Sequence, residues 1–435
     1  MAEPRTFRGT RDFLPPELIG RRRIQEIIEK TYQRYGFQPL ETPAIEYFDV
    51  LTGKSGETDK LIYKLEHKGD ALGLRYDLTV PLARVVAQYR ELPRPFKRYQ
   101  IQPVWRADRP QLRQGRFREF VQCDADIVGT ASLLADAEIV ALTDEILRAL
   151  GFEGFVIRLS SRKLLRGMAR LICGNEEKVF PLCRCIDKLD KIGWEGVKEE
   201  LTECGFDDAV RDRVTKFCGL WNEGPDWGAA EGALESIDIG MDGVHEVREV
   251  YERSVQLGVE SKRLKPDLTL ARGLDYYTGP IFETVLPDRP HIGSLSGGGR
   301  YDSLVATFTD EQVPATGTTL GLDRIQTAMT EIGLFRGEPS LTDVLIAQFD
   351  EDGLPAALAL AARLRKADLN VEVWYEPDRL KKQLAYADRL KIPFVLIIGP
   401  DERAAGQVTV KSLATGEQKT IPKEQVIAFL ESANP

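Results

Sequence analysis

The sequence contains few of the side chains that enzymes most often use for proton transfer and nucleophilic attack. Only three histidines occur among its 435 residues, at His67, His245 and His291, although histidine is the commonest acid–base catalyst. The six cysteines include no CxxC pair, and Cys183 with Cys185 is too closely spaced for a usual zinc site. We therefore interpret the thiols as structural or incidental, and we expect any chemistry to depend on the placement of charge.

The sequence also lacks a long apolar run and a signal-like N-terminus. No apolar segment approaches the roughly 20 residues that span a bilayer, and the first residues, "MAEPRTFRGTRD", carry charges where a signal peptide needs apolar residues. These absences predict a cytosolic protein. The net charge of −9 argues against a broadly basic surface for nucleic acid, although phosphate contacts depend on local clusters rather than on net charge.

The usual glycine-rich phosphate loops are absent as well. The chain has no GxxxxGK[ST] sequence, and "SGGGRYD" does not open a helix after a strand. Arginine offers another way to hold phosphate, because a guanidinium binds two phosphate oxygens at once. Five of the thirteen residues from 106 to 118 are arginine. Spacing alone favours a solvated charged loop, but arginines at several predicted strand ends together favour an anion site; the candidates are Arg106, Arg116, Arg118, Arg272 and Arg324.

Hydrophobic periodicity and turn residues predict an antiparallel core. Residues 18–35 have the spacing of an amphipathic helix, and residues 37–46 contain two prolines and suit a sheet edge or an interface. Two strand patterns on either side of the arginine-rich loop predict a hairpin. Its return strand, 116–129, has polar residues on both faces, unlike a strand that simply turns one face to water.

Residues 271–283, "ARGLDYYTGPIFE", place an arginine, an aspartate and two tyrosines between two segments with strand patterns, 268–271 and 281–286. Polar groups at such a place indicate either poor packing or a site. The two tyrosines taken alone are better interpreted as core aromatics. The segments that follow, 294–308 and 315–329, predict glycine-rich turns, a strand and a closing helix.

The length of the chain predicts more than one domain. Residues 163–262 are helical in pattern and rich in charge, which indicates a helical insertion in the first domain, residues 1–334. Residues 335–342 have the composition of a linker. From 343 to 435 strands and helices alternate, which predicts a separate α/β domain with a parallel sheet. The predicted fold class is α+β, with an antiparallel sheet flanked by helices.

Acidic and amide side chains accompany the arginines. Asp77 and Thr79 lie in "RYDLTVP", and Gln122 and Asp126 lie in "VQCDADIVG". A carboxylate in a cationic pocket can bind an ammonium group or Mg²⁺. Turn formation and helix capping are the structural alternative for Asp77 and Thr79, because both residue types favour these positions.

The order of these segments resembles that of the histidyl-tRNA synthetases, a family of class II aminoacyl-tRNA synthetases. The hairpin "VWRADRPQLRQGRFREFVQCDADIVG" resembles motif 2 of that class, "GLDRI" resembles its motif 3 arginine, and "ARGLDYYTG" resembles the segment particular to the histidine enzymes. "RGTRDFLPPE", "RYDLTVPLAR" and "GGGRYDSLV" occur in the family's order. The resemblance begins near residue 5 and continues to the C-terminus, where "RLKKQLAYADRLKIPFVLIIGPDE" resembles the family's anticodon-binding domain.

The resemblance implies a reaction and a role for each candidate residue. Histidine and ATP would form histidyl-adenylate and pyrophosphate, and histidine would then pass to the 3′ end of tRNA(His). Arg106 and Arg272 would be catalytic, because both would contact the α-phosphate. The remaining contacts to ATP would come from Arg116, Phe120, which would stack on adenine, and Arg324, which would hold the γ-phosphate. Histidine would contact Asp77, Thr79, Arg106, Gln122, Asp126, Arg272, Tyr276 and Tyr277, with the two tyrosines in the imidazole pocket.

The resemblance also implies partners. Mg²⁺ would bridge the β- and γ-phosphates of ATP, with no protein side chain assigned to it. Arg113 and Gln114, in the loop 110–116, would contact the acceptor end of tRNA. A homodimer is implied, with the segment 39–43 at the interface. The competing interpretation is a non-catalytic regulatory subunit of ATP phosphoribosyltransferase, which shares this fold but lacks the α/β domain and tends to lose the motif 2 arginines.

Overall fold

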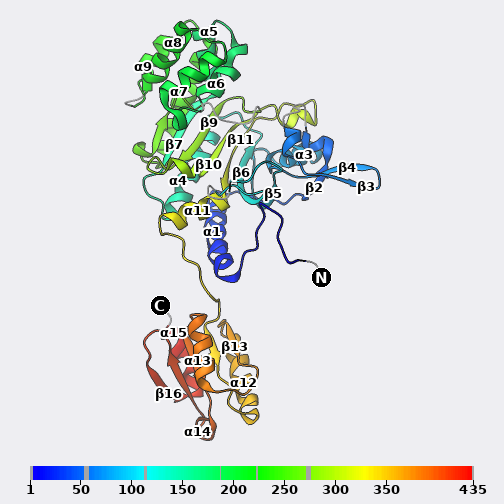
Figure 1. Ribbon diagram of the computed structural model, residues 1–435, viewed down its shortest axis with the longest axis vertical. Coiled ribbons are helices and arrows are strands. Elements are labelled where there is room, and N and C mark those ends of the chain that lie inside the picture. Colours follow the sequence, from blue (N-terminus) through cyan, green and yellow to red (C-terminus); the bar gives the residue numbers. More distant parts are fainter. Residues whose placement is uncertain are drawn as a thin grey trace. The chain divides into compact units, whose positions relative to one another are not determined.

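The computed structural model describes residues 3–52, 58–111, 115–186, 188–221, 224–270 and 276–433. The chain divides into two compact units (Figure 1). One is built from Arg23–Phe335 with the first eleven residues, and the other from Arg336–Pro435 with Asp12–Arg22. Among the described residues, no helix is both long and apolar enough to cross a membrane.

An eight-stranded sheet forms the centre of the first unit. In spatial order its strands are β1 (Gln38–Pro39), β5 (Phe96–Trp105), β6 (Glu119–Val128), β11 (Ala315–Gly321), β10 (Ser296–Arg300), β9 (Pro280–Val285), β7 (Val156–Ser161) and β8 (Leu264–Pro266). All pairings from β5 through to β7 are antiparallel, and only the edge strands β1 and β8 pair in parallel with their neighbours. The predicted antiparallel core, with its hairpin of β5 and β6, is confirmed.

Alternation along β6 gives the sheet one apolar and one polar face. The helices α1 (Pro15–Arg34), α4 (Leu133–Ala149) and α11 (Leu322–Glu331) contribute buried residues to the core of the first unit. Cys123, Ala125 and Ile127 of β6 are buried in the same core. The even-numbered residues of β6 therefore point to the opposite face, where the chain leaves room for a site.

Between β1 and β5 the chain forms a smaller sheet and two helices. The sheet is antiparallel, in the order β2 (Ile45–Tyr47), β4 (Asp70–Leu74) and β3 (Lys64–His67). The helix α2 (Phe48–Thr52) follows β2, and α3 (Thr79–Gln88) follows β4. The "RYDLTVP" segment leads into α3 and lies next to the large sheet. Trp105 N of β5 donates to Arg75 O of this segment at 3.0 Å.

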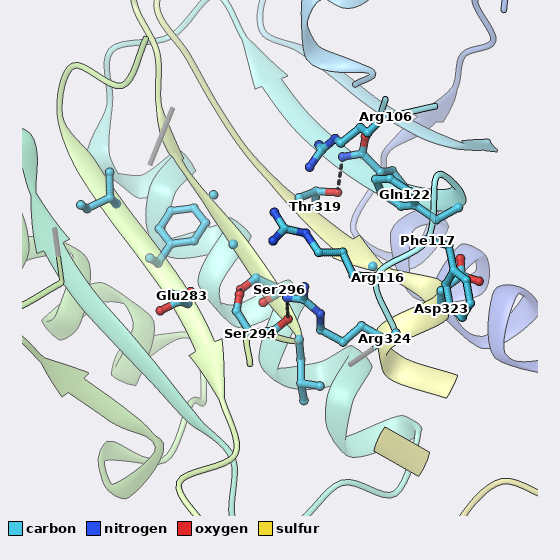
Figure 2. A pocket seen from close by; sticks show the side chains of 18 of the residues that line it. Arg106, Arg116, Phe117, Gln122, Glu283, Ser294, Ser296, Thr319, Asp323 and Arg324 are labelled. Atoms are coloured by element: carbon cyan, nitrogen blue, oxygen red, sulfur yellow. Dashed lines mark hydrogen bonds between the residues drawn. The ribbon is translucent and has the colours of Figure 1, made fainter. Parts of the chain in front are cut away.

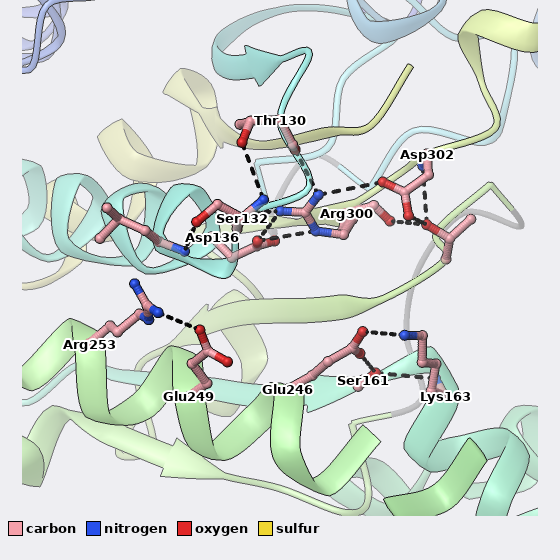
Figure 3. Close-up of polar contacts among 12 residues, drawn as sticks. Thr130, Ser132, Asp136, Ser161, Lys163, Glu246, Glu249, Arg253, Arg300 and Asp302 are labelled. Carbon is pink, nitrogen blue, oxygen red and sulfur yellow. Dashed lines mark hydrogen bonds and ion pairs between the residues drawn. The ribbon is translucent and has the colours of Figure 1, made fainter. Parts of the chain in front are cut away.

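Between β7 and β8 the chain is helical. This stretch contains α5 (Arg162–Cys173), α6 (Val179–Ile186), α7 (Leu189–Glu203), α8 (Asp208–Cys218), α9 (Trp227–Leu234) and α10 (Asp238–Gln256). Glycine lets α5 and α10 approach closely, since a Cβ at Gly243 would lie 2.2 Å from the Leu164 nitrogen. Glu246 of α10 accepts a hydrogen bond from Ser161 Oγ at 2.6 Å and pairs with Lys163 at 2.7 Å (Figure 3). These contacts join the helices to the end of β7.

Two local predictions from the sequence are wrong. Part of the glycine-rich segment expected to form turns is strand β10, which pairs with β11 and β9. Close packing requires glycine there, because a Cβ at Gly298 would lie 2.1 Å from the Gly317 carbonyl oxygen. The strand expected at 268–271 is absent from its described part, 268–270, and β8 lies earlier in the chain.

Arg300, the last residue of β10, ties the sheet to α4. Its Nε donates to Asp136 Oδ2 at 3.1 Å, and its other nitrogens donate to the carbonyl oxygens of Thr130 and Ser132 at 3.0 Å each (Figure 3). Burial raises the pKa of Asp136 to about 6, whereas Arg300 acts in the opposite direction. The pair fixes the end of β10 and therefore the start of the segment that carries Tyr301.

The second unit contains a five-stranded sheet in the order β13 (Val371–Val373), β12 (Val344–Ile346), β14 (Phe394–Ile397), β15 (Gln407–Ser412) and β16 (Gln418–Pro422). Its helices are α12 (Leu354–Arg365), α13 (Leu380–Arg389), α14 (Pro400–Ala405) and α15 (Val426–Ala433). The α/β class is confirmed, but the sheet is mixed rather than parallel, because β15 and β16 pair antiparallel. The connection 398–406 is shorter than the dozen or so residues of a parallel crossover, so β15 returns antiparallel to β14.

Candidate active site

A cavity of about 380 Å³ opens on the polar face of the eight-stranded sheet. Three arginines from separate places line it: Arg106 just after β5, Arg116 just before β6, and Arg324 in the first turn of α11. Figure 2 shows their side chains reaching toward the same space, across from Glu283 of β9. Because a guanidinium binds phosphate oxygens in pairs, the cavity suits an anion with several phosphate groups.

Glycine keeps part of the cavity floor open. Gly297 of β10 lies opposite Thr319 of β11 and Glu283 of β9, and all three line the cavity. A Cβ at Gly297 would meet only the Phe282 carbonyl oxygen, at 3.8 Å. Packing therefore does not demand glycine at this position, in contrast to Gly298, and the missing side chain leaves room for a ligand.

Arg106 is held by its neighbours on both sides. Its Nε donates to the Tyr76 carbonyl oxygen at 3.0 Å, and its backbone nitrogen donates to Arg118 O at 2.8 Å. Its guanidinium carbon lies 5.1 Å from the centre of the Phe120 ring. Arg106 and Phe120, both predicted to contact ATP, thus meet at one wall of the cavity.

Arg116 and Arg324 lie at the wall formed by the hairpin loop and α11. Arg116 Nη2 is 3.6 Å from Asp108 Oδ2, and the Arg116 side chain is 46% exposed. Arg324 Nη1 donates to the Ser294 carbonyl oxygen at 2.7 Å. These contacts orient the two guanidinium groups and leave them beside the cavity.

Asp323 supports this wall and was not predicted from the sequence. Its carboxylate accepts hydrogen bonds from Arg11 and, at 3.0 Å, from the backbone nitrogen of Val121. It thereby joins the N-terminal segment, β6 and α11 directly beside Arg324. Its place next to a predicted site residue in "GLDR" was the only signal, because its partners lie far away in the sequence.

Asp77 lies at the start of α3, and the structure shows one of the two roles that the sequence left open, a capping contact. Its Oδ1 accepts a hydrogen bond from the backbone nitrogen of Val80 at 3.2 Å, which caps the start of α3. Its Oδ2 has no hydrogen-bond partner among the described residues, although Asp77 is only 2% exposed. Burial raises the pKa of Asp77 to about 6, whereas the Val80 hydrogen bond and Arg106 act in the opposite direction.

The polar face of β6 carries a row of three buried side chains, Gln122, Asp124 and Asp126. Polar residues or glycine lie opposite them on both neighbouring strands: Gln102, Gln100 and Arg98 on β5, and Gly321, Thr319 and Gly317 on β11. Gln122 Nε2 donates to Thr319 Oγ1 at 2.9 Å (Figure 2). Most buried polar side chains in folded proteins have a hydrogen-bond partner.

Asp126 forms an ion pair and a hydrogen bond within the protein. Arg98 Nη2 lies 2.8 Å from Asp126 Oδ2, and the Tyr301 hydroxyl donates to Asp126 Oδ1. Burial raises the pKa of Asp126, whereas Arg98 and Tyr301 act in the opposite direction. Arg98 and Tyr301 were not predicted, since no sequence pattern shows which residue lies across a strand.

Asp124 is a second buried acid in this row, and it was not among the site residues predicted from the sequence. It is 2% exposed, and its Oδ1 has no hydrogen-bond partner among the described residues. Burial raises the pKa of Asp124 to about 7, whereas Arg98 opposes and Asp126 adds to this shift. Its position two residues from Gln122 and from Asp126 could have revealed it, because alternate residues of a strand share a face.

Tyr276 and Tyr277 lie at the edge of this row. Their ring centroids are 4.8 Å apart, and the Tyr276 ring lies 5.8 Å from that of Tyr301. Tyr277 lines the cavity, and Thr79 hydrogen-bonds the Tyr276 side chain. The structure therefore brings the two tyrosines, Thr79 and the acids of the polar face together.

Three predicted site residues lie outside the described part of the chain. They are Arg272, Arg113 and Gln114. Their roles stay predictions from the sequence.

A larger cavity of about 770 Å³ adjoins the first and shares Arg116, Glu283 and Arg324 with it. Residues of the helical stretch, such as Trp221, also line it. Arg158 of β7 lies at its wall, with Nε 2.7 Å from Asp267 Oδ2 and Nη1 3.6 Å from Glu283 Oε2. Although burial opposes the shift, Arg158 and Thr269 hold the pKa of Asp267 below its usual range.

The chain is similar to known proteins along its whole length. A family model described as histidyl-tRNA synthetase matches residues 9–325, and one described as an anticodon binding domain matches residues 343–433. A histidine–tRNA ligase of Cytophaga hutchinsonii is 43% identical, with 98% of this chain and 99% of that protein covered. A histidine–tRNA ligase of Aeropyrum pernix is 41% identical, with 99% of each covered. The crystal structure of histidyl-tRNA synthetase from Nostoc sp. PCC 7120 matches with a TM-score of 0.89 and 34% identity over 100% of both chains.

The antiparallel sheet with its arginine-lined cavity and the separate α/β unit are those of a class II aminoacyl-tRNA synthetase. Within that class, the chain belongs to the histidyl-tRNA synthetase family, as its sequence motifs implied. The comparisons favour this assignment over the regulatory subunit of ATP phosphoribosyltransferase, because histidine–tRNA ligases match the full chain, including the anticodon-binding part.

Proposed function

We propose that the arginine-lined cavity and the adjoining row of acids are the place where this chain carries out the reaction of its family. Family membership makes the chain a histidine–tRNA ligase, an ATP-dependent enzyme with histidine and tRNA as its other substrates. The observation that carries the proposal is the convergence of Arg106, Arg116 and Arg324 from the hairpin and from α11 on one cavity.

ATP would occupy the arginine side of the site. Arg106 would contact the α-phosphate and the carboxylate of histidine, Arg324 the γ-phosphate, and Arg116 the phosphate chain. Phe120 lines the same cavity as these cations, and its ring would stack on adenine. Arg272 would stabilise the α-phosphate from the segment before β9.

Histidine would occupy the acidic side of the site. Asp77, Thr79, Gln122 and Asp126 would hold its α-amino end, and Tyr276 with Tyr277 would line the imidazole pocket. A site that pairs both ends of the imidazole leaves buried groups unpaired with any other amino acid, which is a strong source of selectivity.

The chemistry follows from this division. The histidine carboxylate oxygen attacks the α-phosphorus of ATP, the bond to the bridging oxygen breaks, and pyrophosphate leaves with the electron pair. Negative charge develops on the phosphate oxygens, and fixed cations such as Arg106 stabilise it without reorganisation. The step needs little proton transfer, which agrees with a chain that has only three histidines.

Mg²⁺ would enter with ATP. Among the described residues no group of three His, Cys, Asp or Glu side chains is placed to hold a metal ion. Mg²⁺ bound to nucleotides commonly uses one or two carboxylates and the phosphates themselves, and Glu283 is a carboxylate on the cavity wall. The residues therefore fit an ion held mainly by the β- and γ-phosphates, where it would neutralise charge.

The 3′ end of tRNA would reach the adenylate through the larger cavity. Gln111 and Arg116, at the two ends of the hairpin loop, line that cavity. Arg113 and Gln114 in the same loop would contact the acceptor end. The terminal ribose hydroxyl would then attack the histidyl carbonyl carbon, and AMP would leave.

A homodimer and a cytosolic location complete the proposal. β1 lies at the edge of the large sheet, and both of its residues, Gln38 and Pro39, are exposed. A second subunit would pair at this exposed edge, next to the segment 39–43. Analytical ultracentrifugation tests this, because a monomer at micromolar concentration would contradict it.

The domain division is part of the proposal. Residues 1–334 would form the catalytic domain with a helical insertion at 163–262, residues 335–342 a linker, and residues 343–435 the anticodon-binding domain. The matches to residues 9–325 and 343–433 support these boundaries.

The central experiment is ATP–pyrophosphate exchange with each of the twenty amino acids. Exchange should depend on histidine alone, because only histidine fills both the acidic row and the imidazole pocket. Exchange with a different amino acid, or none with histidine, would contradict the proposed function.

A further inference from the structure

Two thiols of the helical stretch between β7 and β8 lie next to each other. Cys185 Sγ is 3.4 Å from Cys204 Sγ, and the two residues are 19 positions apart in the chain. Cys185 is in the last turn of α6, and Cys204 directly follows the last residue of α7. Both thiols are free. Because the sulfur atoms of a disulfide are about 2.05 Å apart, a small movement would bring this pair to bonding distance.

The two thiols differ in their access to solvent. Cys204 is exposed, whereas Cys185 is only 1% exposed. Burial and the contact with Cys204 raise the pKa of the Cys185 thiol to about 12, whereas Lys188 acts in the opposite direction. A buried thiol with a raised pKa is unreactive toward dissolved oxidants, because the thiolate is the nucleophile. Cys204 is therefore the thiol that an oxidant in solution meets first, with Cys185 directly behind it.

Non-covalent contacts hold the two thiols in place. Lys188, just before α7, pairs with Glu200 in the last turn of that helix, with Nζ 2.5 Å from Oε1. The backbone nitrogen of Lys188 also donates to the Cys185 carbonyl oxygen at 3.3 Å. These contacts join the end of α6 to the end of α7, so Cys185 and Cys204 stay close to each other in the reduced protein.

The end of α6 also borders the larger cavity. Ile186, the neighbour of Cys185, and Leu189, the first residue of α7, both line the cavity of about 770 Å³. A disulfide restricts the distance between its two Cα atoms to about 4.4–6.8 Å. A bond between Cys185 and Cys204 would therefore fix the end of α6, and with it this part of the cavity wall, against the end of α7.

We propose that Cys185 and Cys204 form an intramolecular disulfide when a peroxide oxidises the protein, and that this bond slows the transfer of histidine to tRNA. Disulfides of cytosolic proteins are usually transient and redox-sensing, and redox-sensing thiols are commonly exposed and next to a second cysteine. The effect on tRNA rests on the proposed function, because it takes the larger cavity as the path of the tRNA 3′ end. The formation of the disulfide does not depend on that function.

The oxidation takes two steps. The Cys204 sulfur attacks one oxygen of hydrogen peroxide, the O–O bond breaks, and the other oxygen leaves as water with the thiol proton. The Cys185 sulfur then attacks the sulfur of the resulting sulfenic acid, the S–O bond breaks, and a second water leaves with the proton of Cys185. Two electrons pass from the two sulfurs to the peroxide. A dithiol such as dithiothreitol reduces the bond again by thiol–disulfide exchange.

Tryptic mapping of the full-length protein tests the disulfide. After treatment with hydrogen peroxide, free thiols are blocked with N-ethylmaleimide, and the digest is analysed by mass spectrometry without reduction. Trypsin releases Cys185 in the peptide 185–188 and Cys204 in the peptide 199–211, and each peptide contains a single cysteine. We expect the two peptides to be joined, lighter than their sum by the two hydrogens lost, and to separate when dithiothreitol is added.

Two activities of the oxidised protein test the effect of the bond. Charging of tRNA should fall by about threefold or more, because a displacement of about 1 Å in a binding site can change a rate strongly. ATP–pyrophosphate exchange with histidine should stay within about twofold, because, among the described residues, Ile186 and Leu189 line the larger cavity and not the smaller one. Dithiothreitol should restore charging.

Cys204→Ser removes the exposed sulfur, so this variant should keep its charging activity after peroxide treatment. Cys173→Ser is the matched control, because it removes another partly exposed thiol of the helical stretch and should respond to peroxide as the unmodified protein does.

Three results would overturn the inference. In the first, the peptides 185–188 and 199–211 stay unlinked after peroxide treatment. In the second, Cys204 joins two copies of the chain, which non-reducing gel electrophoresis detects as a dimer. In the third, the disulfide forms but charging is unchanged, or Cys204→Ser loses as much charging activity as the unmodified protein. Failure of the reduced, unmodified protein to exchange with histidine is a separate result, which contradicts the proposed function itself.

Discussion

The arginine side and the acidic side of this site differ in how far their side chains are exposed to water. On the arginine side, which comprises Arg106, Arg116 and Arg324, the Arg116 side chain is 46% exposed. On the acidic side, which comprises Asp77, Asp124 and Asp126, exposure is 2–3%. The arginines follow or precede strands, at loop and helix ends, whereas two of the acids lie within a strand.

The difference shows that the burial of a position decides whether an arginine or a carboxylate there can carry its charge. An arginine stays charged in nearly any environment, so a cation at an open strand end can meet a flexible polyphosphate. A buried carboxylate keeps its charge only when something offsets the loss of water. Burial raises the pKa of Asp77, Asp124 and Asp126 alike, and Arg98 opposes the shift at all three; Arg98 lies 2.8 Å from Asp126 Oδ2. We infer that the open side serves phosphate and the closed side selects the amino acid.

The largest effect is expected from breaking the arginine side. Arg272→Ala should abolish adenylation, a loss of about 10³-fold or greater, because a fixed cation at the reacting phosphate is removed. Single-turnover formation of histidyl-adenylate measures this. The melting temperature and tRNA binding should stay unchanged. Normal adenylation in this variant would show that Arg272 has a structural role.

Breaking the buried pair on the acidic side should affect stability most. Arg98→Met leaves Asp126 buried without its cation, and should lower the free energy of unfolding by about 3–5 kcal/mol. Urea unfolding monitored by circular dichroism measures this. Arg248→Met is the matched control, because its partner Glu252 is on the surface with 53% side-chain exposure, and should have little effect.

The double variant Arg98→Met, Asp126→Leu sharpens the result. It removes both charges, so it should recover much of the lost stability. A double variant as unstable as Arg98→Met alone would show that packing, rather than an unpaired charge, explains the loss.

The effect of Asp124 on stability should depend on pH, unlike that of the arginines. Its pKa is raised to about 7 in the folded protein, compared with about 3.9 in an unfolded chain. Between these values the folded state binds more protons than the unfolded state, so Asp124 reduces stability as pH rises and the full reduction is present above pH 7.

Asp124→Asn should therefore stabilise the ligand-free protein at pH 8, on the order of 2 kcal/mol, and much less at pH 5. Melting temperatures of the variant and the unmodified protein at both pH values measure the difference. An equal shift at pH 5 and pH 8 would contradict the assignment, because a neutral cause such as packing does not depend on pH.

The smallest effect is expected from the second partner of Asp126. Tyr301→Phe removes one donor but leaves Arg98, and should lower the free energy of unfolding by about 1.5 kcal/mol. Tyr375→Phe is a matched control, because Tyr375 is 89% exposed. If the two variants unfold at the same urea concentration, the Tyr301 hydroxyl contributes nothing to the acidic side.

Much of the fold was predictable because local periodicity reports local structure. The hairpin of β5 and β6 and the α/β unit followed from alternation and spacing. β10 was missed because three consecutive glycines indicate a turn when neighbours are unknown. Only the pairing with β9 and β11 shows that glycine there permits a close approach of strands.

The site was predictable to the same extent and for the same reason. Arg106, Phe120, Gln122 and Arg324 stood out because each lies in a motif. Arg98, Asp124 and Tyr301 did not, because their importance comes from what lies across a strand.

The amino-acid sequence by itself determined the class of protein, the order of its segments and which kinds of charge the site contains. These are properties of residue type and spacing along the chain. Only the tertiary structure decided which charges are satisfied. Asp124 and Asp126 are two residues apart in one strand, yet Arg98 and Tyr301 pair with Asp126, whereas Asp124 hydrogen-bonds Thr319. The physical reason is that burial and pairing depend on neighbours from β5, β10 and β11, which are distant in sequence and meet only in the folded sheet.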